Sequence, residues 1–232
     1  MKKNKILMTI LYSCRREKSR EMTKLEWLEE RKKGIGGSDA SAILGRNPYK
    51  TNIILWKEKT GRKEAEDISD KEYVKYGTEA EEHLRELFKL DYPQYEVKHN
   101  LNAMIWDKEY PFLFATLDGE LIDKETGELG ILEIKTTNIL QSMQKEKWND
   151  KIPDNYYIQI LHYLMVTNYS FVVLKAQLKY NYNGEIRLNT KHYFINRKDV
   201  EEDIKYLRKR EIEFWQEYVL KDKEPPLMLP VI

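Results

Sequence analysis

The sequence predicts an α/β fold in which helices flank a mixed central β-sheet. Helical and strand-like patterns alternate along the 232 residues, a length that fits one domain. Apolar residues form 41% of the chain, which is enough to build a sizeable core and excludes a disordered tail. The dipeptide Asn183-Gly184 lies between two strand-like runs and is a strong hairpin signal. Together these observations favour one mixed α/β domain.

Residues 1–21 are expected to form a poorly ordered N-terminal extension, ahead of a single domain at residues 22–232. The extension begins with basic residues, followed by an apolar run at 6–12 and a charged stretch from Arg15. The apolar run is short and interrupted, so an export signal is the less favoured alternative. Met22 is a second candidate for the start of the protein. No apolar run approaches the ~20 residues that a membrane span needs.

Capping signals place the expected helices. Thr23 begins a capping box, so a helix runs from Thr23 to Gly34. Residues 35–37 are expected to form a tight loop, after which Ser38 or Asp39 caps a short helix. Further helices are expected where apolar residues recur at helical spacing, at residues 51–59, 71–90, 154–167 and 197–221.

The strands are expected in two groups, at residues 96–105, 112–121, 129–136, 171–180 and 185–195. Polar turn residues at 123–127 join the second and third strands into a hairpin. The order of helices, strands, helix, strands and helix favours one domain built around a mixed sheet.

Three charged residues on the 112–121 and 129–136 strands suggest chemistry. Alternate residues of a strand share a face, so Glu133 and Lys135 point the same way, and a closed hairpin brings Asp118 beside them. Two carboxylates hold Mg²⁺ through hard oxygen ligands, and an adjacent lysine orients or helps deprotonate a water. Phosphodiester cleavage needs these parts. The alternative is a cross-strand charge pattern on a solvated sheet face, which the triplet alone leaves open.

The 71–90 helix supplies a third carboxylate. Glu81 shares the apolar stripe of this helix with Leu84 and Phe88, whereas Arg85 is expected on another face. An isolated buried charge is costly, so a metal or a cation is expected to compensate Glu81. The alternative is a glutamate at the helix edge that pairs with a lysine.

Several short motifs follow one another between residues 22 and 170. They are Arg31-x-x-Gly34-Ile35-Gly36-Gly37-Ser38-Asp39, Tyr76-Gly77-x-x-x-Glu81, Asp118-Gly119, Glu133-Ile134-Lys135 and Tyr156-x-x-Gln159-x-x-x-Tyr163. In this order they resemble the lambda-exonuclease (YqaJ-like viral recombinase) family. The resemblance implies a PD-(D/E)XK nuclease-like core and degradation of linear duplex DNA from its 5′ ends in phage-type recombination. Leu117 departs from the motif name, which expects proline before the aspartate.

The resemblance also implies roles for the residues at the metal. Asp118, Glu133 and Glu81 match catalytic metal ligands, and the main-chain carbonyl of Ile134 matches a further ligand. Lys135 matches the lysine that orients or activates the water. The implied metal is Mg²⁺, for which Mn²⁺ is expected to substitute.

Four further residues are implied at the substrate. Arg31 and Ser38 match positions that receive a phosphate, which we expect to be the 5′ end of the DNA strand. Tyr156 and Gln159 match a helix whose polar side chains approach the active site, with Gln159 in a catalytic position and Tyr156 in a substrate-binding one.

The implied partners are linear double-stranded DNA with 5′-phosphorylated ends, a single-strand annealing protein, and further copies of the chain, as in a ring trimer. The expected location is the cytoplasm of a bacterial host, with no membrane partner. Two alternatives stay open: another PD-(D/E)XK endonuclease of restriction or repair type, and a catalytically decayed DNA-binding module. A single cysteine excludes a disulfide scaffold and a CxxC zinc site.

The net charge of +1 at first argues against a nucleic-acid partner. However, basic residues cluster at 31–33, 57–63 and 145–151, and a metal would neutralise the acidic residues of its site. The charge pattern therefore favours a local basic track over a uniformly basic surface.

Overall fold

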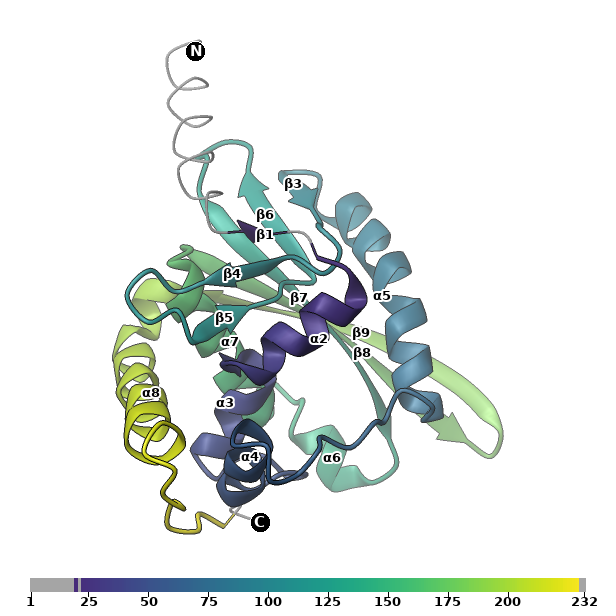
Figure 1. Cartoon of the computed structure of the whole chain (residues 1–232). Coiled ribbons are helices and arrows are strands. Elements are labelled where there is room, and N and C mark those ends of the chain that lie inside the picture. Colours follow the sequence, from purple (N-terminus) through teal and green to yellow (C-terminus); the bar gives the residue numbers. More distant parts are fainter. Residues whose placement is uncertain (1–18, 21, 230–232) are drawn as a thin grey trace.

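Two β-sheets form the framework of the computed structural model, which describes residues 19–20 and 22–229 (Figure 1). The larger sheet has the strand order β3 (Tyr95–Lys98), β6 (Gly119–Asp123), β7 (Leu129–Ile139), β8 (Phe171–Tyr182) and β9 (Glu185–Asn196). The smaller sheet has the order β1 (Ser19–Arg20), β4 (Met104–Trp106), β5 (Leu113–Ala115) and β2 (Ile35–Gly36). The β7–β8 and β2–β5 pairs are parallel and the others antiparallel, so the predicted mixed α/β fold is confirmed.

The helices are α2 (Lys24–Lys32), α3 (Gly37–Ile43), α4 (Asn52–Lys59), α5 (Glu72–Asp91), α6 (Ser142–Glu146), α7 (Asp154–Thr167) and α8 (Glu201–Glu213). A 3₁₀ turn (Arg197–Asp199) precedes α8, and a π-helical segment (Phe214–Val219) follows it. The sequence did not predict α6. Figure 1 shows α5 running along one side of the larger sheet and α8 at the opposite side of the molecule.

The alternation of side chains along β7 divides the core into two parts. Leu132 and Ile134 pack with Leu84 and Phe88 of α5 on one face. Ile131 lies on the other face, in the larger cluster that contains most of α7. Glu133 and Lys135 share the face of Ile131, so they point toward α7 as the alternation predicts.

Two expected strands are each split between the sheets. The segment 96–105 contains β3 and β4, and the segment 112–121 contains β5 and β6. In the first segment the chain turns at Asn102, which has a left-handed backbone with φ 56°. The prediction of continuous strands was wrong because local strand propensity does not show that a chain crosses from one sheet to another. Asp118 lies where the second of these segments passes from the smaller to the larger sheet, directly before β6.

The segment 35–37 is not the expected tight loop. Ile35 and Gly36 pair with Leu113 and Phe114 of β5 in parallel, and α3 begins at Gly37. Gly36, and not Ser38 or Asp39, is the N-cap of α3, but the Asp39 carboxylate accepts from the Gly36 N–H over 3.3 Å and so contributes to the capping of this helix. A Cβ at Gly36 would lie 2.8 Å from the Phe114 ring, which explains why glycine occupies this close approach between strands.

Most of the expected N-terminal extension, residues 1–18 and 21, lies outside the described residues. Ser19 and Arg20 are described, and they pair with Ile105 and Met104 of β4. Among the described helices, none has both the length and the apolar character needed to cross a bilayer.

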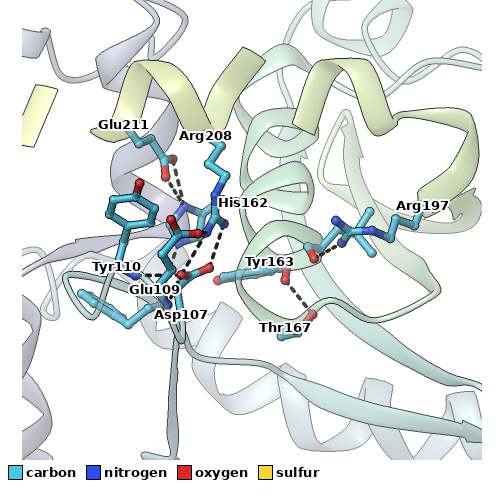
Figure 2. A network of polar contacts seen from close by, with 11 residues as sticks. Asp107, Glu109, Tyr110, His162, Tyr163, Thr167, Arg197, Arg208 and Glu211 are labelled. Atoms are coloured by element: carbon cyan, nitrogen blue, oxygen red, sulfur yellow. Dashed lines mark hydrogen bonds and ion pairs between the residues drawn. The ribbon is translucent and has the colours of Figure 1, made fainter. Parts of the chain in front are cut away.

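A buried ion pair joins α7 to α8 (Figure 2). His162 Nδ1 lies 2.9 Å from Glu211 Oε1, and His162 Nε2 donates to the main-chain carbonyl of Phe114 over 2.8 Å. Both side chains are fully buried. Burial lowers the pKa of His162, but the Glu211 carboxylate outweighs this effect and the pKa is raised, which favours the imidazolium. The pair fixes α7 against α8 and β5.

Candidate active site

Glu133 and Lys135 lie on one face of β7, and Asp118 joins them from the turn before β6. Lys135 Nζ lies 2.5 Å from Glu133 Oε1. The main-chain N–H of Ile134 donates to Asp118 Oδ2 over 2.8 Å and thereby holds this carboxyl at the strand. Glu133 is 1% exposed, and its Oε2 is buried with no hydrogen-bond partner in the described part of the chain. The structure thus brings together the two predicted carboxyls and the predicted lysine.

The pKa values at this site show an unbalanced negative charge. Burial raises the pKa of Asp118 well above its usual range, and Glu133 raises it further, whereas Lys135 lowers it in part. Burial likewise raises the pKa of Glu133 against the lowering effect of Lys135. Burial lowers the pKa of Lys135, but the two carboxylates outweigh it and the pKa is raised. One ammonium group therefore faces two buried carboxyls, and a bound cation would be stabilised there.

Helix α7 supplies three side chains to the site. Gln159 Nε2 donates to Glu133 Oε1 and to Tyr163 Oη, each over 2.8 Å. The Tyr156 ring centre lies 5.5 Å from Lys135 Nζ. Both predicted α7 residues therefore reach the site. Tyr163 was missed as a site residue, although its i, i+4 spacing from Gln159 places both on one helix face.

Glu81 approaches from α5, where Arg85 holds it. Arg85 Nη1 lies 3.0 Å from Glu81 Oε1 and donates to the main-chain carbonyl of Asp118 over 2.5 Å. The Arg85 side chain is buried and pairs with Glu81, so the expectation that it lies on a different face of the helix from Glu81 was wrong. The long arginine side chain reaches back one helical turn to buried acceptors, and the Glu81–Arg85 spacing of four residues was the available signal.

The two predicted phosphate ligands lie together where α2 meets α3. Arg31 Nη2 donates to Ser38 Oγ over 3.0 Å. The buried Lys59 side chain lies 2.8 Å from Asp39 Oδ2 and donates to the main-chain carbonyl of Arg31 over 2.9 Å. Burial raises the pKa of Asp39, but Lys59 and Arg31 outweigh it and the pKa is lowered. We call these four residues the Arg31 cluster. Two cations face one carboxylate beside an exposed hydroxyl, an arrangement that suits an anion.

Gly37 connects the Arg31 cluster to the carboxylates. A Cβ at this position would lie 2.5 Å from Tyr163 Cε1 and 3.0 Å from Gln159 Cγ, so only glycine permits this approach of α3 to α7. Ser38 follows directly in the chain. The cluster therefore adjoins Gln159, which in turn contacts Glu133.

The predicted basic track is smaller than the sequence indicates. Lys32, Lys33 and Arg62 each form an ion pair with a nearby carboxylate. Lys59 is buried in the Arg31 cluster. The lysines of the segment 145–151 are exposed.

The oxygen donors of the site fit a hard divalent cation. The buried Glu133 Oε2 has no hydrogen-bond partner among the described residues, and burial, together with Glu133, raises the pKa of Asp118, so a bound cation would favour the carboxylate form of Asp118. Among the same residues, no three His, Cys, Asp or Glu side chains lie close enough together to form a complete ligand set, and Glu81 pairs with Arg85. Asp118 and Glu133 are the ligands that the geometry supports best.

Comparisons with known proteins agree with this architecture. A model of the YqaJ-like viral recombinase domain matches residues 26–170. The uncharacterized protein YqaJ of Bacillus subtilis (strain 168) is 35% identical over 214 residues, which cover 90% of this chain and 61% of that protein. The chain thus spans about 61% of the length of this relative.

Two crystal structures of LHK-Exo share the fold at 15% identity, and each match covers 86% of this chain and 97% of the other. One is a complex with dAMP, with a TM-score of 0.56. The other is described as an alkaline exonuclease from Laribacter hongkongensis, with a TM-score of 0.55.

The fold is of the PD-(D/E)XK nuclease-like class, and it carries the carboxylate–lysine pair of Glu133 and Lys135 on β7. Within this class, the chain belongs to the YqaJ-like viral recombinase family.

Proposed function

We propose that this protein is a divalent-metal-dependent nuclease that removes nucleotides from the 5′ ends of linear double-stranded DNA in phage-type recombination. The observation that carries the proposal is the buried Glu133 Oε2, which has no hydrogen-bond partner in the described part of the chain and lies beside Asp118 and Lys135. Family membership and the fold shared with an alkaline exonuclease support the same class of activity.

Asp118 and Glu133 would hold Mg²⁺, and Glu81 and the main-chain carbonyl of Ile134 would complete its ligands. Mn²⁺ would substitute, because it also prefers oxygen donors. When bound, the metal supplies a Lewis acid that offsets charge on the phosphate and acidifies a water.

The residues around the carboxylates would position the substrate and the water. Lys135 has a raised pKa and is an ammonium group, so it would donate hydrogen bonds to the attacking water or to a phosphate oxygen. Gln159 fixes the Glu133 carboxylate, and Tyr163 accepts from the same amide and fixes Gln159 in turn. The Tyr156 ring limits the space in which Lys135 moves.

The Arg31 cluster would bind the 5′-terminal phosphate. Arg31 and the Ser38 hydroxyl offer charge-assisted and neutral donors to phosphate oxygens. Lys59 neutralises Asp39, so the carboxylate does not repel the incoming anion. Because the cluster adjoins Gln159 through Gly37, the terminal phosphate and the scissile phosphate would lie close together on one strand.

We further propose that the protein acts in the cytoplasm of a bacterial host with a single-strand annealing protein. The single strand that the nuclease exposes is the substrate such a partner requires. Several copies of the chain, as in a ring trimer, would enclose the duplex and compensate for the small net charge.

Linear duplexes labelled at the 5′ or the 3′ end of one strand test the proposal. We expect label to be released first from the 5′ end, and faster from 5′-phosphorylated than from 5′-hydroxyl ends. Arg31→Ala should remove the preference for phosphate, and Lys135→Ala should abolish release while the protein remains folded. Lys205→Ala, which changes an exposed residue of α8, is the control. Equal rates on both ends would refute the phosphate assignment, and first release from the 3′ end would refute the direction.

A further inference from the structure

An exposed aromatic residue lies on a turn that contacts helices from both parts of the proposed substrate site. The Tyr49 side chain is 87% exposed, more than any other large apolar or aromatic side chain in the described part of the chain. It lies in the turn between α3 and α4. A ring with this exposure gains little from packing, so the stability of the fold does not explain it.

The backbone of this turn is fixed although the ring is free of the core. Asn47 Oδ1 accepts hydrogen bonds from the main-chain N–H groups of Tyr49 (2.8 Å) and Lys50 (3.0 Å). Asn47 Nδ2 donates to Ser41 Oγ over 3.1 Å, which ties the turn to α3. With the backbone fixed, only the two side-chain torsions of the tyrosine lose freedom when the ring binds, so the entropic cost is small.

The two residues flanking the turn anchor it to both parts of the site. Arg46 Nη1 lies 3.3 Å from Asp154 Oδ2 at the start of α7, two residues before Tyr156. Lys50 Nζ lies 2.5 Å from Glu58 Oε2 of α4, the helix that also carries Lys59. The turn therefore bridges the helix of the cleavage site and the helix of the Arg31 cluster.

Tyr49 also lies close enough to Tyr156 for an electrostatic effect. Burial raises the pKa of Tyr156, Lys135 lowers it, and Tyr49 raises it slightly. The turn that carries Tyr49 thus lies near the start of α7, where Arg46 contacts Asp154 two residues before Tyr156.

We propose that Tyr49 stacks on the nucleobase of the nucleotide at the 5′ end of the substrate strand. This inference rests on the proposed function, because the base of that nucleotide would lie between the terminal phosphate and the scissile phosphate. Stacking on an aromatic ring tolerates every base, so it suits an enzyme that proceeds along DNA of any sequence. Tyr49 would hold the terminal nucleotide while the next phosphate reaches Lys135.

The binding test uses a duplex with 2-aminopurine as its 5′-terminal, phosphorylated nucleotide, since its fluorescence responds to stacking. Affinity and fluorescence are measured with Mg²⁺ in a Lys135→Ala background that prevents digestion. Tyr49→Ala should weaken binding by about 5- to 150-fold, the range of base–aromatic stacking, and should remove the fluorescence change on binding. Tyr49→Phe and Tyr49→Trp should keep both, because they keep a ring.

Tyr206→Ala is the matched control, since Tyr206 is also an exposed tyrosine (58%) and lies on α8. Its affinity and fluorescence should equal those of the parent. If Tyr49→Ala also equals the parent, or if Tyr49→Phe loses affinity as Tyr49→Ala does, the stacking role is overturned.

The outcome separates this inference from the proposed function. If the unmodified protein digests linear duplex but Tyr49→Ala binds normally, the inference alone fails. If the protein binds duplex ends with a Tyr49-dependent signal but never cleaves them, the nuclease proposal fails and the stacking site stands. If it does not bind duplex ends, both fail.

Discussion

Replacing Asp118 by asparagine should stabilise the metal-free protein while destroying its metal site. Asparagine keeps an oxygen that accepts the hydrogen bond from the Ile134 N–H. It removes one of the two buried negative charges that face a single ammonium group at Lys135. The substitution therefore separates the contribution of Asp118 to folding from its contribution to metal binding.

The expected size of the effect follows from the charges. Two like charges about 4 Å apart repel by roughly 4 kcal/mol at an effective dielectric constant of about 20, and the attraction of Asp118 to Lys135 offsets much of this. We expect a net gain of about 1–2 kcal/mol, typical of relieving an unfavourable functional site. For a chain of this length, that gain raises the melting temperature by roughly 2–8 °C.

The pH dependence has a definite sign. Because the pKa of Asp118 is raised in the folded state, the wild type loses stability as pH rises above the unfolded value of about 3.9 and through the raised value. The Asp118→Asn protein has no carboxyl at this position, so its folding stability does not show this decline with rising pH. The stability difference between the two proteins should therefore be small near pH 4 and should grow toward neutral pH.

Thermal unfolding in EDTA and in increasing Mg²⁺ measures both effects. A ligand at about 100 times its dissociation constant stabilises the folded state by about 2.7 kcal/mol, so the wild type should overtake Asp118→Asn in saturating Mg²⁺. The control Asp70→Asn, at a side chain that is 98% exposed, should change stability by less than about 0.5 kcal/mol. An Asp118→Asn protein that melts below the wild type in EDTA would show that this account of the site electrostatics is wrong.

Three further substitutions test the surroundings of the site. His162→Gln leaves a buried glutamate unpaired and should cost about 3–5 kcal/mol in urea unfolding. Because the folded-state pKa of His162 is raised, its contribution is complete below about pH 6.5 and declines as pH rises through the raised value. Gly37→Ala places a Cβ 2.5 Å from Tyr163 Cε1, so it should cost about 1–3 kcal/mol and reduce nuclease activity by roughly tenfold or more. Lys59→Met leaves Asp39 buried without its paired lysine and should cost about 3–5 kcal/mol of folding stability. If any of these three variants melts at the wild-type temperature, the contact that it removes does not stabilise the fold as described.

The sequence predicts the part of the site that depends on local periodicity. The alternation along β7 placed Glu133 and Lys135 on one face, and the polar turn at 123–127 predicted the β6–β7 hairpin. The motif order predicted that Gln159 approaches the active site, and the structure places its amide on Glu133. The strand alternation and the hairpin follow from spacing within one element or between two adjacent elements, whereas the approach of Gln159 was implied by the family resemblance.

The remaining features depend on tertiary contacts that local patterns do not encode. The split of the expected strands at 96–105 and 112–121 follows from the choice between two sheets, which is decided by packing. Arg85 is buried because the main-chain carbonyl of Asp118, which is distant in the sequence, accepts a hydrogen bond from it, and its spacing in α5 does not indicate this contact. The role of Lys59 emerges only where α4 packs beside Asp39.

Digestion of linear and covalently closed circular duplex DNA, each with Mg²⁺ and with EDTA, tests the central claim most directly. We expect the protein to degrade the linear form with Mg²⁺, to leave the closed circle intact, and to degrade neither form in EDTA. The Lys135→Ala protein should leave both forms intact under every condition. Cleavage of the closed circle would instead indicate an endonuclease, and degradation in EDTA, or no degradation of linear DNA with Mg²⁺, would contradict the proposed metal-dependent exonuclease.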